Sequence, residues 1–329
     1  MTSSPTGSPE VLCIGESMAL FVPAEPGPPD EVRTWLRTIG GAESNVACHL
    51  PALGVPSGWV SAVGDDPFGR ALVRAIAAAG VDVRGVVVDP VRPTGLYVKE
   101  SGASGSPVRY YRAGSAASAM GPELLSRLDF SGVRVLHLSG ITPALSDSCL
   151  ALVRALLDRP RGDLLVSFDV NHRPALWSGR DPSLLAELAG RADLVLTGDD
   201  EAERVWGTGD PARLRKLLPG PRTLVVKHGE RGATLVEGSE SLFAPALQVD
   251  VVEPVGAGDA FAAGFLAATL RGADPLTRLR RGHLQAAATL LTQDDVGAPL
   301  ADAVVSLLLD ADSDGWRAAR LTGEGVVAT

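Results

Sequence analysis

The sequence predicts an α/β protein with a mostly parallel central sheet flanked by helices and a small antiparallel β lid. Short, almost entirely apolar segments alternate with longer amphipathic ones, as expected for strands buried on both faces and joined by helical crossovers. The last third instead indicates two long helices, at 259–270 and 276–292. A second group of segments alternates apolar and polar residues, which is typical of half-exposed antiparallel strands.

These patterns place each element. We expect buried strands at 11–14, 58–63, 133–138, 164–168, 194–196 and 223–226. We expect helices between them at 43–53, 68–79, 146–158, 184–191, 201–206 and 212–218. The half-exposed strands pair 20–22 with 34–39 and 95–100 with 108–112, across turn-rich stretches at 24–30 and 101–107. The prediction is one domain over 10–310, with lid strands inserted at about 20–39 and 93–113, and terminal tails at 1–9 and 311–329.

Composition excludes several classes of protein. The chain has 329 residues, 45% of them apolar, which suits one large domain. Its net charge of −9 argues against a nucleic-acid partner, and a protein of this charge that binds anions must concentrate positive charge locally. No apolar run reaches the roughly 18 residues of a membrane span, and the polar start lacks the pattern of a signal peptide. We therefore expect no membrane partner and a cytoplasmic location.

A glycine-rich loop carries the strongest chemical signal. Residues 253–261 read Glu-Pro-Val-Gly-Ala-Gly-Asp-Ala-Phe and open directly into an apolar helix. Gly256 and Gly258 allow the backbone to approach a ligand, and the helix start, with Ala257, favours phosphate. Asp259 is placed to take a proton from a substrate hydroxyl, although an aspartate that only caps the helix would fit the same pattern. There is no Walker-type phosphate loop and no dinucleotide fingerprint.

Four motifs together resemble the PfkB family of ribokinase-like carbohydrate kinases. They are the stretch 256–261, the segment from Gly40-Gly41 to Asn45, and the stretches 63–69 and 226–232. The resemblance extends from about residue 11 to residue 299. It implies the ribokinase-like fold, ATP-dependent phosphorylation of a sugar, and Asp259 as the catalytic base. It also implies that Gly40, Gly41 and Asn45 contact the sugar.

Within that family the chain is most similar to the 2-keto-3-deoxygluconate kinases. Three stretches carry this resemblance, at 93–97, 110–118 and 168–177. They imply that the substrate is bound by Tyr97, Tyr110, Tyr111, Arg112 and Arg173. Two arginines suit a sugar acid, because a planar guanidinium pairs with a carboxylate through two parallel hydrogen bonds. The expected reaction phosphorylates the terminal hydroxyl of 2-keto-3-deoxygluconate (2-dehydro-3-deoxygluconate) and gives the 6-phosphate.

The same side chains have simpler interpretations. The arginines also fit a surface position or a brace for a loop, and the tyrosines fit a cover for the sheet face. At the level of function, a kinase for fructose, ribose or a nucleoside is one alternative, and a sugar-binding regulator without catalysis is another. The residues do not distinguish the gluconate-derived from the galactonate-derived acid.

The resemblance also implies a nucleotide site with Mg²⁺, because ATP is used as its magnesium complex. The residues expected there are Asn171, Thr197, Lys227, Gly229, Gly232, Gly256 and Gly258. Glu201 is a candidate for an indirect metal role only, because the family's Asn-x-x-Glu is here Gly198-Asp-Asp-Glu201. Finally, an exposed lid with free strand edges favours a homo-oligomer that pairs through the lid sheet.

Overall fold

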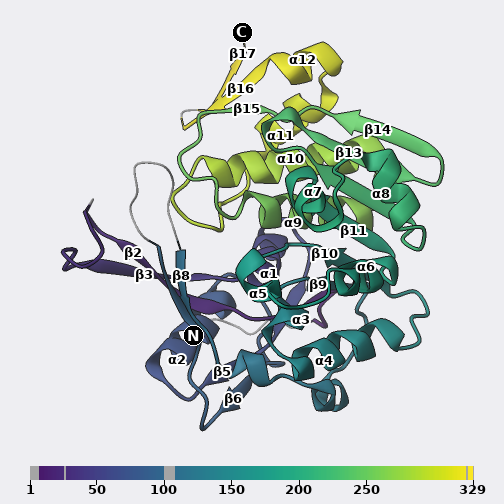
Figure 1. The fold of residues 1–329 in the computed structure, drawn as a ribbon. Coiled ribbons are helices and arrows are strands. Elements are labelled where there is room, and N and C mark those ends of the chain that lie inside the picture. Colours follow the sequence, from purple (N-terminus) through teal and green to yellow (C-terminus); the bar gives the residue numbers. More distant parts are fainter. Residues whose placement is uncertain (1–6, 26, 100–107, 324, 329) are drawn as a thin grey trace.

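The computed structural model describes residues 7–25, 27–99, 108–323 and 325–328. Its centre is an eight-stranded sheet (Figure 1). The strands of this sheet are β1 (Val11–Ile14), β4 (Ser57–Val60), β9 (Val135–Ser139), β10 (Leu165–Asp169), β11 (Leu194–Gly198), β12 (Thr223–Lys227), β13 (Ala233–Glu237) and β14 (Glu240–Ala244). They lie in the order β14-β13-β12-β11-β10-β9-β1-β4, and all run in the same direction except β13, which is antiparallel to β12 and β14. The predicted, mostly parallel sheet is confirmed.

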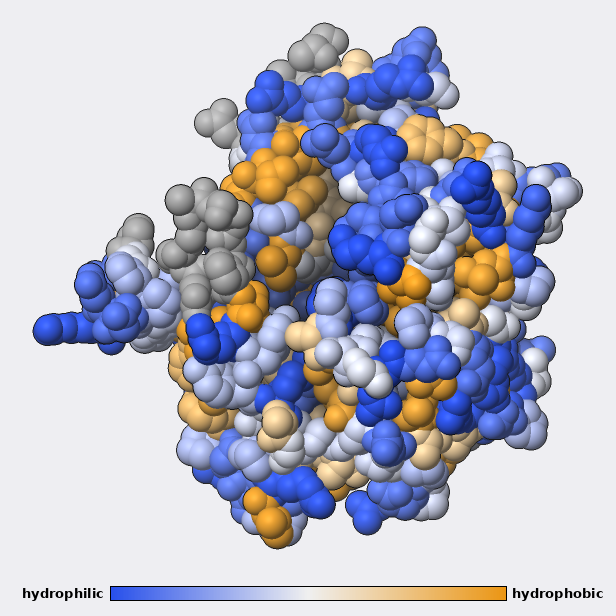
Figure 2. All heavy atoms as spheres, in the orientation of Figure 1, coloured by the Kyte–Doolittle hydropathy of each residue, from blue (hydrophilic) through white to orange (hydrophobic). Residues whose placement is uncertain are grey.

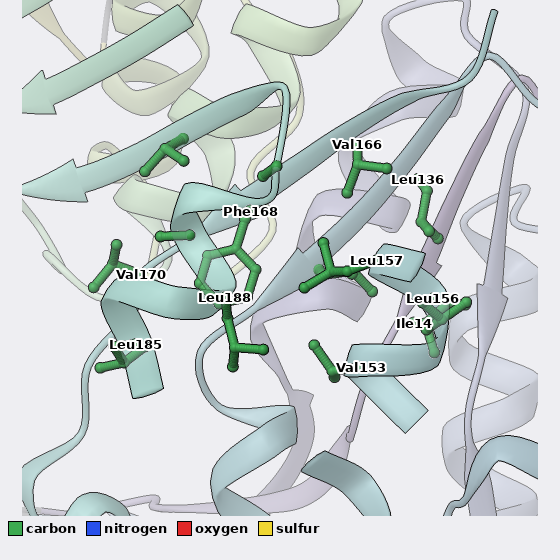
Figure 3. Packing of buried hydrophobic residues seen from close by; sticks show 14 of the residues in the cluster. Ile14, Leu136, Val153, Leu156, Leu157, Val166, Phe168, Val170, Leu185 and Leu188 are labelled. Carbon is green, nitrogen blue, oxygen red and sulfur yellow. The ribbon is translucent and has the colours of Figure 1, made fainter. Parts of the chain in front are cut away.

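Helices cover both faces of this sheet. One face packs against α1 (Ala42–Ala52), α2 (Pro67–Ala78), α9 (Ala257–Leu270) and α10 (Pro275–Leu290). The other packs against α4 (Asp147–Asp158), α6 (Ser183–Gly190), α7 (Asp199–Trp206) and α8 (Pro211–Leu217). Figure 3 shows the second layer, where Phe168 of β10 meets Leu188 of α6. Neighbouring residues such as Val135 and Leu136 belong to opposite layers, which explains why the central strands are apolar throughout.

Several helices begin at a signal that is visible in the sequence. An aspartate at the N-cap is followed by proline in the first turn, and its side chain accepts a hydrogen bond from the amide three residues on. The pairs are Asp66-Pro67, Asp210-Pro211 and Asp274-Pro275. The starts of α2, α8 and α10 are therefore set by the local sequence.

The lid is a four-stranded sheet beside the main one. It consists of β2 (Met18–Pro23), β3 (Trp35–Gly40), β7 (Leu96–Lys99) and β8 (Val108–Tyr111), in the order β3-β2-β7-β8. The pairs β2–β3 and β7–β8 are antiparallel, as expected, and a parallel pairing of β2 with β7 joins them. The turn expected at 101–107 lies outside the described residues.

Two expectations about elements were wrong. The strand expected at 58–63 is two strands, because the chain leaves the main sheet after β4 and β5 (Ala62–Gly64) pairs with β6 (Val87–Asp89). The described residues of the tail expected at 311–329 are folded. They form α12 (Ser313–Ala318), β16 (Ala319–Thr322) and β17 (Gly325–Ala328), and β16 pairs with β15 (Gln248–Val249).

The folded C-terminal segment is held by apolar burial. Trp316 is fully buried, and its indole nitrogen donates a hydrogen bond to the Pro245 carbonyl at 2.8 Å. It packs with Leu321, with Leu284 of α10 and with Leu308 of α11 (Asp302–Asp310). Among the described helices, none is long and apolar enough to cross a membrane.

Candidate active site

A cleft of about 400 Å³ opens where the lid meets the carboxyl ends of the main strands. Figure 2 shows this face of the molecule hollowed beside the lid. Thirteen of the residues predicted from the sequence line the cleft, from segments that lie far apart in the chain. They are Gly40, Gly41, Asn45, Tyr97, Tyr110, Arg112, Asn171, Arg173, Glu201, Lys227, Gly256, Gly258 and Asp259.

Asp259 lies in the first turn of α9, at the floor of the cleft. The N-cap is Gly256 and not Asp259, so the interpretation of Asp259 as a simple helix cap does not hold. Gly256 has φ 85°, and a Cβ there would meet the backbone oxygen of Asp295 at 2.4 Å. Ala260 donates the first intrahelical bond, to the Gly256 carbonyl at 2.9 Å. The amides of 257–259 precede that bond and are placed to meet an anion.

The environment of Asp259 suits a general base. Burial raises the pKa of its carboxyl to about 7, and the nearby Asp169 adds to the rise. Asn45 opposes it by donating from Nδ2 to Asp259 Oδ2 at 2.9 Å, and Lys227 and Arg173 also favour the ionised form. A carboxylate whose pKa is close to neutral accepts a proton most effectively at neutral pH.

The lid closes one end of the cleft. Tyr97 stacks on Tyr110 with ring centroids 5.5 Å apart, and its hydroxyl lies 3.5 Å from Asp295 Oδ2. A Cβ at position 40 would lie 1.8 Å from the Tyr97 hydroxyl oxygen, so only glycine fits there. Gly41 is equally restricted, because a Cβ would meet the Glu16 carbonyl oxygen at 2.4 Å. The two glycines thus allow the lid to lie directly on the start of α1.

Both predicted arginines line the cleft, and both already face a carboxylate. Arg112 forms an ion pair with the buried Glu16, whose other oxygen accepts a hydrogen bond from Ser115 at 2.7 Å. Arg173 lies 3.7 Å from Glu201 and its side chain is 45% exposed. Arg112 is therefore the more rigid of the two, and Arg173 is the one that is free to move toward a ligand.

The ends of β10 and β12 form the side opposite the lid. Lys227 donates to Asp169 at 2.9 Å, and this neighbour and Glu201 raise the pKa of Lys227 although burial alone would lower it. Asn171 has φ 38°, a conformation rare outside glycine and commonest for asparagine and aspartate. Glu201 caps its own helix by accepting from the Gly198 amide at 2.8 Å, and burial raises its pKa.

Some predicted residues lie outside the cleft lining. Tyr111 is 56% exposed on the face of β8 opposite to Tyr110. Thr197 is fully buried and donates to the Gly198 carbonyl at 3.2 Å. Ala257, Gly229 and Gly232 are also not part of the lining, although Ala257 belongs to the same helix start and both glycines follow β12.

The sequence analysis missed three acidic residues of the cleft. Asp169 ends β10, within the stretch already noted at 168–177, and that position at a strand end was the available signal. Glu16 follows β1 and was recognisable only through its partner Arg112. Asp295 is 8% exposed, and burial raises its pKa to about 6. It lies in a polar stretch after α10 that gave no signal.

Comparisons with known proteins identify the family of this chain. The family model described as pfkB family carbohydrate kinase matches residues 8–300. A 2-dehydro-3-deoxygluconokinase of Bacillus subtilis is 35% identical over 308 residues, which cover 91% of this chain and 95% of the relative.

Solved structures show the same fold. An uncharacterized sugar kinase from Pyrococcus horikoshii, solved in complex with ATP, is 26% identical with a TM-score of 0.80, covering 90% of this chain and 97% of that one. A putative ribokinase from E. coli is 23% identical with a TM-score of 0.83, covering 91% and 98%. The chain therefore belongs to the pfkB family of carbohydrate kinases, has the ribokinase-like fold, and is a phosphotransferase with an alcohol as acceptor.

Proposed function

We propose that this kinase uses ATP to phosphorylate the terminal hydroxyl of 2-keto-3-deoxygluconate, giving the 6-phosphate. One observation carries the proposal: a single cleft holds Asp259 at a helix start together with Tyr97, Arg112 and Arg173. The similarity to the Bacillus subtilis enzyme supports the same substrate.

The proposed chemistry is a proton transfer combined with phosphoryl transfer. The Asp259 carboxylate takes the proton from the sugar hydroxyl as that oxygen attacks the γ-phosphorus of ATP. The bond between the γ-phosphorus and the oxygen that links it to the β-phosphate breaks, and ADP leaves. The amides at the start of α9 and the Lys227 ammonium meet the charge on the transferring group. Lid residues such as Tyr97 keep water away from the site, which limits wasteful hydrolysis of ATP.

ATP and Mg²⁺ fit the side of the cleft opposite the lid. The Pyrococcus horikoshii kinase, which was solved with ATP, supports the nucleotide. Asp169 Oδ1 is buried with no hydrogen-bond partner among the described residues, and Glu201 lies nearby in the same lining. These two carboxylates are proposed to hold the water shell of Mg²⁺, which would supply positive charge against the phosphates. Asn171, Gly229 and Gly232 are proposed to border the nucleotide, and the buried Thr197 is proposed to support this side of the cleft from the end of β11.

The preference for a sugar acid depends on the two arginines. Arg112 keeps unused donors beside its pairing with Glu16, and Arg173 can exchange its distant contact with Glu201 for a substrate carboxylate. Tyr97 and Tyr110 then cover the sugar from the lid, and Gly40, Gly41 and Asn45 lie below it.

A substrate panel tests the proposal directly. ATP consumption is measured with the gluconate-derived acid, the galactonate-derived acid, fructose, ribose and a nucleoside, and the product is identified. We expect turnover of a 2-keto-3-deoxy acid at least about tenfold above any neutral sugar, as expected for one charge-assisted contact. Preference for a neutral sugar would refute the acid assignment, and absence of turnover with every sugar would support a non-catalytic regulator.

We also propose a homo-oligomer that pairs through the lid. The edge strands of the lid are β3 and β8, and Leu36 on β3 is 61% exposed. Light scattering of the purified protein tests this, and a monomer at all concentrations would refute it. The cytoplasmic location stays a prediction.

A further inference from the structure

Lys99 lies on the inner face of the lid. Along β7, Tyr97 and Lys99 are buried, whereas the intervening Leu96 and Val98 are only partly so. Successive side chains of a strand point to opposite faces, so Lys99 shares the cleft side of the lid with Tyr97. A lysine that is 7% exposed needs a partner for its charge.

That partner is Glu253, at the start of the glycine-rich loop. The two side chains form an ion pair and are only 9% and 13% exposed. The second carboxylate oxygen of Glu253 accepts a hydrogen bond from the Val255 amide at 3.1 Å. Val255 is followed directly by Gly256, the N-cap of α9. A continuous chain of contacts thus leads from the lid strand to the helix start that carries Asp259.

Burial makes the Lys99 and Glu253 side chains depend on each other. A buried charge without its partner is strongly unfavourable, and a pair withdrawn from water is little screened by salt. The pair between Arg320 and Asp250 is a contrast, since its side chains are 51% and 49% exposed. An exposed pair of that kind contributes little to stability.

Lys99 also acts on Asp295. Burial raises the pKa of Asp295 to about 6, and the neighbouring carboxylates of Glu253 and Asp294 add to this rise. The ammonium of Lys99 and the hydrogen bond from the Tyr97 hydroxyl lower the pKa. The ammonium of Lys99 therefore helps to keep Asp295 ionised at neutral pH. Asp295 is the carboxylate that faces the Tyr97 hydroxyl.

We infer that Lys99 is a positioning residue, which holds the lid against the loop at 253–256 through Glu253 and so places Tyr97 over the sugar while fixing the start of α9. The inference rests on the proposed function only in that a sugar occupies this cleft. No contact between Lys99 and the substrate is required.

The test compares four variants with the wild type: Lys99→Met, Lys99→Arg, Lys99→Met combined with Glu253→Gln, and Glu253→Gln alone. We expect Lys99→Met to raise the KM of the sugar about tenfold and to lower kcat, with the KM of ATP changed less than about twofold. Lys99→Arg should recover most of the loss. Because the two residues act as a pair, their losses in kcat/KM for the sugar should not multiply. The loss in the double variant should be at least about fivefold smaller than the product of the losses in the two single variants. The control Arg320→Met should behave as wild type.

A pH profile separates positioning from a purely structural role. Lys99→Met removes the ammonium that opposes the rise in the pKa of Asp295, so the part of the acid limb of kcat/KM for the sugar that Asp295 contributes should move to higher pH. In the double variant neither charge remains, and the limb should return toward its original position. An unshifted limb in Lys99→Met, or single losses that simply multiply in the double variant, would overturn the inference.

Two further experiments test the inference if Lys99→Met does not fold or if the substrate is a different sugar. If Lys99→Met fails to fold, the double variant, which has no lone buried charge, is compared with the wild type by hydrogen exchange at 93–99. We expect faster exchange there, and unchanged exchange would contradict the inference. If the wild type phosphorylates another sugar, the proposed substrate fails, and the Lys99 comparison is made with that sugar.

Discussion

Replacing Asn45 by alanine should move the pH dependence of the reaction. Asn45 is 3% exposed, and its Nδ2 donates to Asp259 Oδ2 at 2.9 Å. Burial raises the pKa of Asp259 to about 7. The bond from Asn45 favours the ionised carboxylate and is the largest effect that lowers this pKa. Its removal must therefore raise that pKa further.

The size of the shift follows from the energy of the bond. A hydrogen bond to a charged group contributes about 1.5–3 kcal/mol, and one pKa unit equals about 1.4 kcal/mol, which gives an upward shift of about 1–2 units. Water can enter the cleft and replace part of the bond, so we expect about one unit. A protonated base cannot accept the hydroxyl proton. At pH 7 the ionised fraction then falls about fivefold, whereas at pH 9 it is almost unchanged.

The assay is kcat/KM for the sugar between about pH 5.5 and pH 9.5, since this quantity reports the pKa of the free enzyme. The expected result is an acid limb near pH 7 for the wild type and about one unit higher for Asn45→Ala, with recovery at high pH. Asp259→Asn is the control and should show no recovery. A loss of equal size at every pH would mean that Asn45 orients the substrate and does not tune the base.

Four other outcomes are expected. Asp259→Asn should lower kcat at least ~10²-fold, as for a lost general base, with ATP binding measured by calorimetry unchanged. Arg173→Ala and Arg112→Ala should each raise KM for the sugar acid roughly tenfold to a hundredfold, and should raise KM much less for an analogue in which the carboxylate is reduced to an alcohol. An equal rise in KM for the acid and the alcohol would refute the assignment of the arginines to the carboxylate. Hydrogen exchange at 93–99 should slow when the sugar binds, and an unchanged rate would refute lid closure. Trp316→Ala should lower the free energy of unfolding in urea by about 3–5 kcal/mol, and a loss below about 1 kcal/mol would mean that the C-terminal segment contributes little.

The main sheet and the loop with Asp259 were predictable because their signals are local. Apolar strands buried on two faces and Asp-Pro helix starts each occupy a few consecutive residues. The glycines are equally local, because Gly256 must adopt φ 85° and Gly40 must admit the Tyr97 hydroxyl. A requirement on one backbone position can be read from one residue.

What could not be predicted depends on pairs that are distant in the chain. Glu16 and Asp295 are ordinary acidic residues until the fold brings them to Arg112 and Tyr97. The C-terminal segment has short alternating elements, and its packing against the main domain through residues such as Trp316 depends on the tertiary structure. Pairing of charges across the cleft is set by tertiary structure and leaves no local pattern.

The charges in the cleft change one argument made from composition. We expected an acidic protein that binds anions to concentrate positive charge at its site, but the lining holds three cations and five carboxylates. The cations are Lys227, Arg112 and Arg173, and the carboxylates are Glu16, Asp169, Glu201, Asp259 and Asp295. Each cation already faces an acid, so side chains alone do not attract two anionic ligands. The amides at the start of α9 supply compensating positive charge, and the proposed magnesium ion would add to it. Glu16 and Asp169 then serve a different purpose, because they hold Arg112 and Lys227 in position before either ligand arrives.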